Sequence, residues 1–180
     1  MAYSLNNLLD DVLAGHRLTE EEAVRLLSAR GRDVWRIAAA ADELRERKVG
    51  DTVTYVRNQN INVTNLCVNA CGFCGFSRKP GDPDSFCHDE AVVREKARAA
   101  RERGVTEICT VSGLHPAFNA DSYVNIYSWM REEAPGVHIH ASNPMEVAYA
   151  ARKSGISSRE VLERMREAGL STLCGTAAEI

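Results

Sequence analysis

Four short apolar stretches, separated by segments with helical spacing, constrain the fold of this chain more than any other feature. The stretches are residues 61–64, 107–111, 137–141 and 170–173, and the second is nearly continuous in its apolar character. Strands that alternate with helices through short connections form parallel β–α units. Parallel strands covered on both faces are apolar throughout. The pattern therefore predicts an α/β fold of the (β/α) TIM-type barrel class.

The length of the chain limits how much of such a barrel it can form. A complete barrel needs about 250 residues, and rarely fewer than about 200, whereas this chain has 180. The barrel pattern is also preceded by a predicted helical segment, in which Thr19 with Glu22 forms a capping box and Asp33 caps a third helix. We therefore expect a helical extension at residues 1–50 and the first half of a barrel, in a longer protein, at residues 51–180. Within the second part, residues 52–56 alternate like a further strand.

Charge and composition exclude several classes of partner. The net charge is −3 and the isoelectric point is near 6.0, which favours neither a nucleic acid nor a membrane surface as partner. The N-terminus has no basic segment followed by an apolar core, so we expect a cytoplasmic protein. In a reducing compartment the six cysteines are expected to be metal ligands or buried thiols instead of disulfides.

Three of these cysteines follow the first apolar stretch at C-x3-C-x2-C spacing, namely Cys67, Cys71 and Cys74. Thiolates this close can face a single inorganic centre, and sulfur ligands select zinc, Cu(I) or iron–sulfur clusters. Structural zinc sites usually have four protein ligands, which here would require Cys87 or His88 as the fourth. A four-iron cluster held by three cysteines instead leaves one iron open to a small molecule.

The spacing, with an aromatic residue before the last cysteine, resembles the signature of the radical S-adenosylmethionine (SAM) family. The resemblance implies that Cys67, Cys71 and Cys74 hold a [4Fe–4S] cluster whose open iron binds SAM, and that Phe73 packs near the adenine. An electron from the cluster then cleaves SAM to a 5′-deoxyadenosyl radical. It also implies a radical SAM (β/α) TIM-type barrel, of which this chain is the N-terminal portion.

Small and polar residues follow the other predicted strands, and in a β–α barrel the chemistry lies at these strand ends. Ser112-Gly113 resembles the position of the family's glycine-rich SAM-binding segment, and Ser142 and Glu179 follow the third and fourth strands. We therefore expect Gly113, Ser142 and Glu179 to bind the cofactor. Glu179 is alternatively a carboxylate favoured by the dipole at a helix start.

Two histidines at strand ends, His115 and His140, are candidates for proton donors or substrate ligands. Each is alternatively a structural, hydrogen-bonded residue. His138 lies on the same strand face as His140 but deeper, and we expect it to be structural.

Longer segments resemble one branch of the family, CofH, the tyrosine-using subunit of deazaflavin (FO) synthase. The segments are residues 62–69, 72–76, 113–116, 138–147 and 175–180. This resemblance implies a transferase that joins the 4-hydroxybenzyl group of L-tyrosine to 5-amino-6-(D-ribitylamino)uracil in the biosynthesis of FO, the chromophore of coenzyme F420. It further implies an electron donor and a CofG-like second subunit that completes the deazaflavin ring.

Two alternatives stay open at this point. Similar segments occur in radical SAM enzymes of the menaquinone pathway, the aminofutalosine synthase-like MqnE and its relative MqnC. A metal-binding half-barrel without turnover is the other alternative, because half of the expected cavity wall is missing from the sequence.

Overall fold

A computed structural model describes residues 3–69, 71–72 and 74–175 of the chain. The chain forms two compact units, Met1–Thr54 and Tyr55–Ile180. Two residues expected to bind the cofactor, Phe73 and Glu179, lie outside the described residues.

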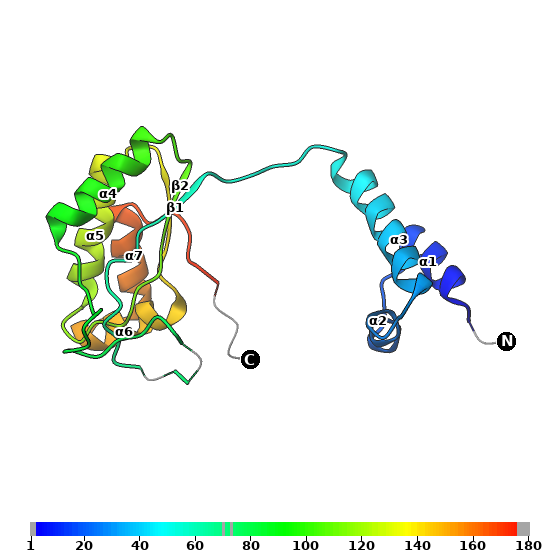
Figure 1. The fold of residues 1–180 in the computed structure, drawn as a ribbon, viewed down its shortest axis with the longest axis horizontal. Coiled ribbons are helices and arrows are strands. Elements are labelled where there is room, and N and C mark those ends of the chain that lie inside the picture. The colour runs from blue at the N-terminus through cyan, green and yellow to red at the C-terminus, as the bar shows by residue number, and fades with distance from the viewer. Residues whose placement is uncertain (1–2, 70, 73, 176–180) are drawn as a thin grey trace. The chain divides into compact units, whose positions relative to one another are not determined.

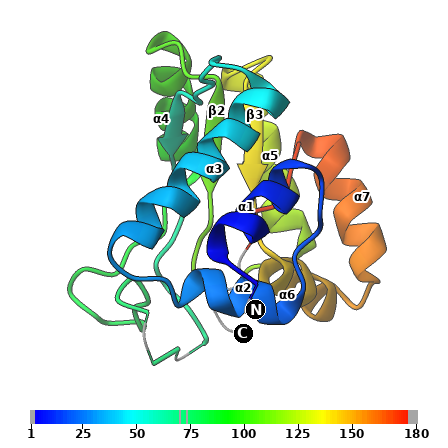
Figure 2. The same ribbon diagram turned by 90° about the vertical axis from the view of Figure 1, so that its right-hand side faces the viewer.

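The first unit consists of three helices, α1 (Leu5–Leu13), α2 (Glu20–Leu27) and α3 (Arg32–Val49). Helix α1 packs along α3 (Figure 1 and Figure 2). The predicted capping box is present, because the Thr19 hydroxyl accepts from the Glu22 amide while the Glu22 carboxylate accepts from the Thr19 amide.

The expectation for Asp33 was wrong. Helix α3 begins at Arg32, and its N-cap position is held by Gly31, which has a positive φ of 60°. Glycine adopts this backbone conformation without steric cost. The helix therefore begins at Arg32, before Asp33, and Asp33 cannot be its N-cap. Asp33 instead lies in the first helical turn and pairs with Arg36 at 3.1 Å.

The second unit is a parallel sheet with helices. Strands β1 (Asn58–Asn60), β2 (Glu107–Thr110) and β3 (His138–Ala141) lie in the order β1-β2-β3, and both pairings are parallel. The helices are α4 (Glu90–Glu102), α5 (Ala120–Glu133), α6 (Pro144–Ser154) and α7 (Ser158–Ala168). Figure 1 shows α4, α5 and α7 on the same side of the sheet.

The positions of two strands near the start of this unit differ from expectation. Residues 52–56 alternate but form no strand within the described part of the chain, and Val53 and Tyr55 are exposed. The first barrel strand is Asn58–Asn60 in place of 61–64. Its polar residues suit an edge position, since the Asn58 amide donates to the Glu107 carboxylate at 2.6 Å.

The segment after this strand is buried but leaves the ladder. The Ile61 amide still donates to the Cys109 carbonyl at 2.9 Å, whereas the Val63 amide donates to the Ser112 hydroxyl. The predicted fourth strand, 170–173, makes only a single parallel bridge, between Thr172 and His140. Both stretches thus lie beside the sheet without joining it as strands.

The hydrophobic core lies between the sheet and its helices. Along β2 and β3 alternate residues are buried, with Ile108 and Ile139 each no more than 1% exposed. They pack with buried residues of the helices, among them Val93, Tyr127, Met130 and Met165. The other face of the same strands carries Glu107, Cys109, His138 and His140, which are only half-buried.

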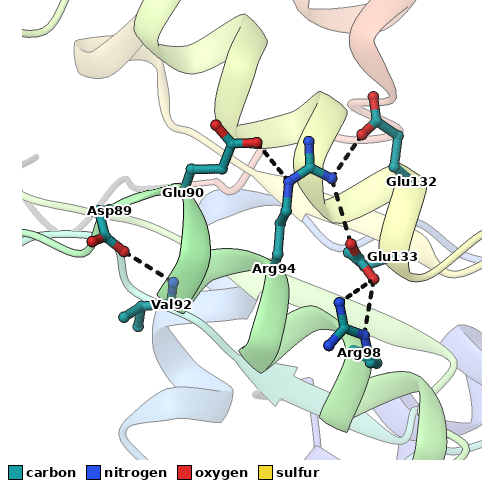
Figure 3. Close-up of polar contacts among 7 residues, drawn as sticks. All are labelled: Asp89, Glu90, Val92, Arg94, Arg98, Glu132 and Glu133. Carbon is teal, nitrogen blue, oxygen red and sulfur yellow. Dashed lines mark hydrogen bonds and ion pairs between the residues drawn. The ribbon is translucent and has the colours of Figure 1, made fainter.

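Charged side chains join α4 to α5 outside this core. Arg94 contacts Glu90 and Glu132, each at 2.7 Å, and Arg98 contacts Glu133 at 3.0 Å (Figure 3). Asp89 caps α4 by accepting from the Val92 amide. Exposed ion pairs contribute at most about 1 kcal/mol each. The ion pairs of Arg94 and Arg98 therefore orient α4 and α5 more than they stabilise them.

Among the described residues, every helix is too short or too polar to cross a bilayer.

Replacement of Met165 by Ala should lower the free energy of unfolding by about 2–5 kcal/mol, because Met165 is fully buried in the core and the truncation leaves a cavity. Chemical denaturation followed by circular dichroism measures this change. Arg159→Ala, at an exposed position of the same helix, is the control and should change stability by no more than about 0.5 kcal/mol. Equal effects of the two substitutions would contradict the assigned core.

Candidate metal and cofactor site

The three cysteines of the motif lie in one loop, residues 67–77, which we call the cysteine loop. Its two ends are joined by the backbone, because the Cys67 amide donates to the Arg78 carbonyl at 3.1 Å and the Arg78 amide donates to the Asn65 carbonyl at 2.8 Å. The Arg78 guanidinium also donates to the Gly75 carbonyl within the loop and to Asp84 beyond it. These bonds hold the start of the cysteine loop directly against the end of the first barrel strand segment.

Asn65 fastens the loop to the following segment. Its side-chain amide donates to the Asp84 carbonyl at 2.9 Å, and its side-chain oxygen accepts from the Phe86 amide at 2.8 Å. The side chain is buried, and a buried amide is stabilised only when its polar atoms are paired. Asn65 therefore fixes where the cysteine loop begins and where the chain returns to the barrel.

All three thiols of the cysteine loop line a single cavity of about 200 Å³. The rest of the lining comes from the loop itself and from the segments that follow β2 and β3: Asn69, Phe76, Ser77, Val111, Ser112, Gly113, Leu114, Asn143 and Met145. Among the residues that the structure describes, the lining thus contains three thiols and no histidine or carboxylate. Neither Cys87 nor His88, the alternative fourth zinc ligands, belongs to it.

The spacing of the thiols bears on the choice of metal. Their three sulfur atoms are not among the described ligand atoms that lie within 4.8 Å of one another. Three thiolates on one tetrahedral zinc ion would be about 3.8 Å apart, given a Zn–S distance of about 2.3 Å. At least one pair of these sulfur atoms is therefore farther apart than two thiolates on one zinc ion, and three soft donors also suit a sulfur-ligated cluster.

Cys67 is the best-anchored of the three thiols. It is half-buried, whereas Cys71 and Cys74 are exposed. The Leu114 amide donates to the Cys67 sulfur at 3.3 Å, and hydrogen bonds to ligand sulfurs are one way in which a protein tunes an iron–sulfur cluster. This bond links the cysteine loop to the segment after β2.

Gly113 allows this link by its lack of a side chain. A Cβ atom at position 113 would lie 2.3 Å from the Leu66 carbonyl oxygen, far inside van der Waals contact. The Gly113 amide donates to the Thr64 carbonyl at 2.8 Å, and the Val68 amide donates to the Leu114 carbonyl at 3.0 Å. The segment after β2 therefore lies backbone to backbone against the start of the cysteine loop, and glycine is required where they meet.

Glu146 is a residue of this region that the sequence analysis did not single out. It is 2% exposed, and its carboxylate accepts from the Ser112 amide at 3.3 Å and the Asn143 amide at 3.0 Å. Burial raises the pKa of this carboxyl to about 8, against the effect of both backbone donors. Its signal in the sequence was the capping pair with Asn143 at the start of α6, which by itself indicates only a helix start.

Three other predicted site residues are placed away from the cavity. The Ser142 hydroxyl hydrogen-bonds Tyr127 in the core, at a position with a positive φ of 53°. The Nδ1 atom of His115 accepts from the Ala117 amide, its ring packs on Phe118, and burial lowers its pKa. His140 contacts Thr172 on the inner face of the sheet. None of the three lines the cavity that the thiols share.

Gly113→Ala should lower the free energy of unfolding of the metal-free protein by about 1–3 kcal/mol, the usual cost of overpacking a tight site. Denaturant titration measures the loss. The control is Gly75→Ala, because a Cβ at position 75 meets open space. An alanine at position 113 that costs no more than the control would show that the close approach to Leu66 is not rigid.

Glu146→Gln should remove a pH dependence of stability. The folded pKa of about 8 lies above the unfolded value of about 4.3, so the folded state binds more protons between these limits. Wild-type stability should fall as pH rises through this window, by up to about 1.4 kcal/mol per pH unit.

Glutamine at position 146 cannot titrate, so the free energy of unfolding of wild type minus that of the variant should decrease from pH 5 to pH 8. Urea denaturation at several pH values tests this. Glu163→Gln, at a half-exposed position of α7, is the control and should run parallel to wild type. A variant at position 146 that also runs parallel would contradict the raised pKa.

Comparison with known proteins gives consistent relatives. The chain is 80% identical over 176 residues to a 5-amino-6-(D-ribitylamino)uracil–L-tyrosine 4-hydroxyphenyl transferase of Methanoculleus marisnigri, covering 98% of this chain and 48% of that protein. It is 41% identical to the protein of the same name from Nostoc, over 96% of this chain and 46% of the relative. An FO synthase of Mycobacterium leprae is 43% identical over 90% of this chain, which corresponds to 19% of that protein. The chain thus spans about half the length, or less, of the curated relatives it matches.

Solved structures and a family model agree on the fold. The crystal structure of methylornithine synthase (PylB) superposes with a TM-score of 0.62 at 19% identity, covering 94% of this chain and 57% of that one. The [FeFe]-hydrogenase maturase HydG of Carboxydothermus hydrogenoformans gives the same TM-score at 17% identity, over 94% of this chain and 47% of that one. Residues 61–177 match the model of the radical SAM superfamily. The chain, with its partial parallel barrel and its three-cysteine cavity, belongs to the radical SAM superfamily.

Proposed function

We propose that this chain is part of a radical SAM transferase that joins the 4-hydroxybenzyl group of L-tyrosine to 5-amino-6-(D-ribitylamino)uracil in FO biosynthesis. The observation that carries the proposal is the shared cavity of Cys67, Cys71 and Cys74 in a chain 80% identical to a transferase with this name. Because the chain spans about half of that relative, the activity, both substrates, an electron donor and a CofG-like second subunit are assigned to the whole protein. Residues 1–50 would be its helical extension and residues 51–180 the first part of its barrel.

The three thiols fit a [4Fe–4S] cluster, since they are soft ligands that face one cavity and leave a fourth coordination position to a small molecule. When bound, the cluster and SAM supply one-electron reductive cleavage. The chain's own contribution is to hold the ligands: Cys67 is fixed by the Leu114 amide, and the loop ends are fixed by Arg78.

The segment after β2 supplies the other wall of the cofactor site. Ser112, Gly113 and Leu114 line the same cavity as the thiols, and their backbone can approach a bound molecule because position 113 has no side chain. Glu146 holds this segment from behind through the Ser112 amide. We infer that Gly113 binds SAM through its backbone, and that Glu146 positions the segment that contains Gly113.

The two candidate catalytic histidines are not part of the wall of this cavity. His115 and His140 both lie outside the lining of the cavity. The His115 ring accepts from the Ala117 amide, and the His140 ring contacts the Thr172 hydroxyl. We therefore propose no proton transfer by either histidine at the cofactor.

Cys71→Ala in the full-length protein, reconstituted anaerobically with iron and sulfide, should lose the cluster and reduce SAM cleavage to background. Iron and sulfide content, electron paramagnetic resonance and release of 5′-deoxyadenosine measure the loss. Cys87→Ala, outside the cavity, is the matched control and should retain both. A Cys71 variant that keeps its cluster would contradict the ligand assignment.

The substrate assignment has its own readout. Wild-type protein given SAM, a reductant, tyrosine and the ribitylaminouracil should form an adduct with the mass of the uracil plus a 4-hydroxybenzyl group. SAM cleavage without this adduct would show a radical SAM enzyme with another substrate, including one of the menaquinone type.

A further inference from the structure

The inner face of the sheet carries a second cluster of metal-ligating side chains. Glu107 opens β2 and His138 opens β3, and the two are paired in register; His140 follows on the same face of β3. One ligand atom from each of the three lies within 4.8 Å of the other two. In the described part of the chain they are the one set of three such residues that meets this spacing.

We propose that Glu107, His138 and His140 bind one divalent transition-metal ion, at a site separate from the three cysteines. Two imidazoles and one carboxylate are ligands that suit zinc, iron(II) and cobalt(II), whereas thiolates suit clusters and softer ions. Three protein ligands also leave coordination positions for water or another small molecule. None of the three residues lines the cavity shared by the thiols, so the site does not depend on the proposed function.

The surroundings orient both imidazole rings. The Thr172 hydroxyl lies 2.8 Å from Nε2 of His138 and 2.7 Å from Nδ1 of His140. A hydroxyl oxygen has two lone pairs and can accept an N–H from each ring. In these tautomers the lone pairs stay on Nδ1 of His138 and Nε2 of His140, and a metal bound by both rings would use these two nitrogens. A hydrogen-bonded partner on the far nitrogen is the usual support of a metal-binding histidine.

The carboxylate is oriented in the same way. The Asn58 side-chain amide donates to one oxygen of Glu107 at 2.6 Å, which leaves the other oxygen for a metal. Asn58 is also the register partner of Glu107 on β1. The three strands and the Thr172 segment therefore each supply either a ligand or a group that orients one.

Another group on this face is a thiol. Cys109 is the register partner of His140, and it is half-buried. A thiolate bound to cobalt(II) gives a charge-transfer absorption that imidazole and carboxylate ligands do not give, so the spectrum separates the proposed ligand set from one that includes Cys109.

The test is an anaerobic cobalt(II) titration of the full-length protein carrying Cys67→Ala, Cys71→Ala and Cys74→Ala, which removes the competing thiolates. We expect one equivalent of cobalt per chain, with a visible d–d spectrum and no thiolate charge-transfer band. His138→Gln and His140→Gln should each weaken binding at least tenfold. The matched control is His115→Gln, outside the cluster, which should bind as the parent does.

A further variant tests the site without changing a ligand, in case the histidine variants fail to fold. Thr172→Val keeps the size of the side chain and all three ligands but removes the hydroxyl that orients both rings, and we expect a loss of affinity of about 10–100-fold. The proposal is overturned if the parent binds no stoichiometric cobalt, if the His138 and His140 variants bind as tightly as the His115 control, or if the spectrum shows a thiolate ligand.

Discussion

A run of backbone contacts beyond the ends of β1 and β2 is the constraint on which the cysteine site depends. Where the regular ladder stops, the Val63 amide turns to the Ser112 hydroxyl, and the Gly113 amide reaches the Thr64 carbonyl. These bonds bring the segment after β2 against the start of the cysteine loop. The Leu114 amide then meets the Cys67 sulfur at 3.3 Å. Parallel pairing alone brings strand ends to one edge, but this closer approach is what joins two loops into one cavity.

The buried carboxyl group of Glu146 joins the segment after β3 to the segment after β2. Glu146 spans from the start of α6 to the Ser112 amide, and it is almost fully buried. A buried carboxyl is costly unless its oxygens are hydrogen-bonded, and here two backbone amides meet that need. Its pKa is nevertheless raised, because burial disfavours the charged carboxylate more than the two backbone hydrogen bonds favour it. The cavity is thus held by backbone and capping groups, several of which belong to residues that also line it.

Much of this fold could be predicted from periodicity, and the exceptions have physical causes. The strands β2 and β3 and the four barrel helices follow apolar patterns and capping residues. The stretch at 52–56 has the alternation of a strand, but alternation does not supply a partner, and Val53 is 87% exposed. The polar strand Asn58–Asn60 was missed because its side chains pair with Glu107 and Arg103 across an edge. Such pairing depends on residues more than 40 positions away and leaves no local pattern.

The candidate site shows the same division. The spacing of three cysteines after a strand predicts a shared centre, because the ligands are close in sequence. The placement of Ser142 and His115 could not be predicted this way, since a residue at a strand end can turn either to the mouth or to the core, and Tyr127 and Phe118 draw these two inward. The burial of Glu146 could not be predicted from the sequence, because the capping pattern with Asn143 is the same for an exposed and for a buried glutamate.

The two faces of the sheet separate two kinds of chemistry. Side chains that alternate along β2 and β3 point either to the helices, where Ile108 and Ile139 are buried, or to the inner face, where Glu107, His138 and His140 converge. The thiols lie beyond the strand ends and belong to neither face. A polar cluster on the inner face does not contribute to the hydrophobic core. Its histidines and carboxylate are instead held in fixed orientations by Thr172 and Asn58. Orientation of this kind costs side-chain entropy, and a bound cation of the class that imidazole prefers would offset that cost.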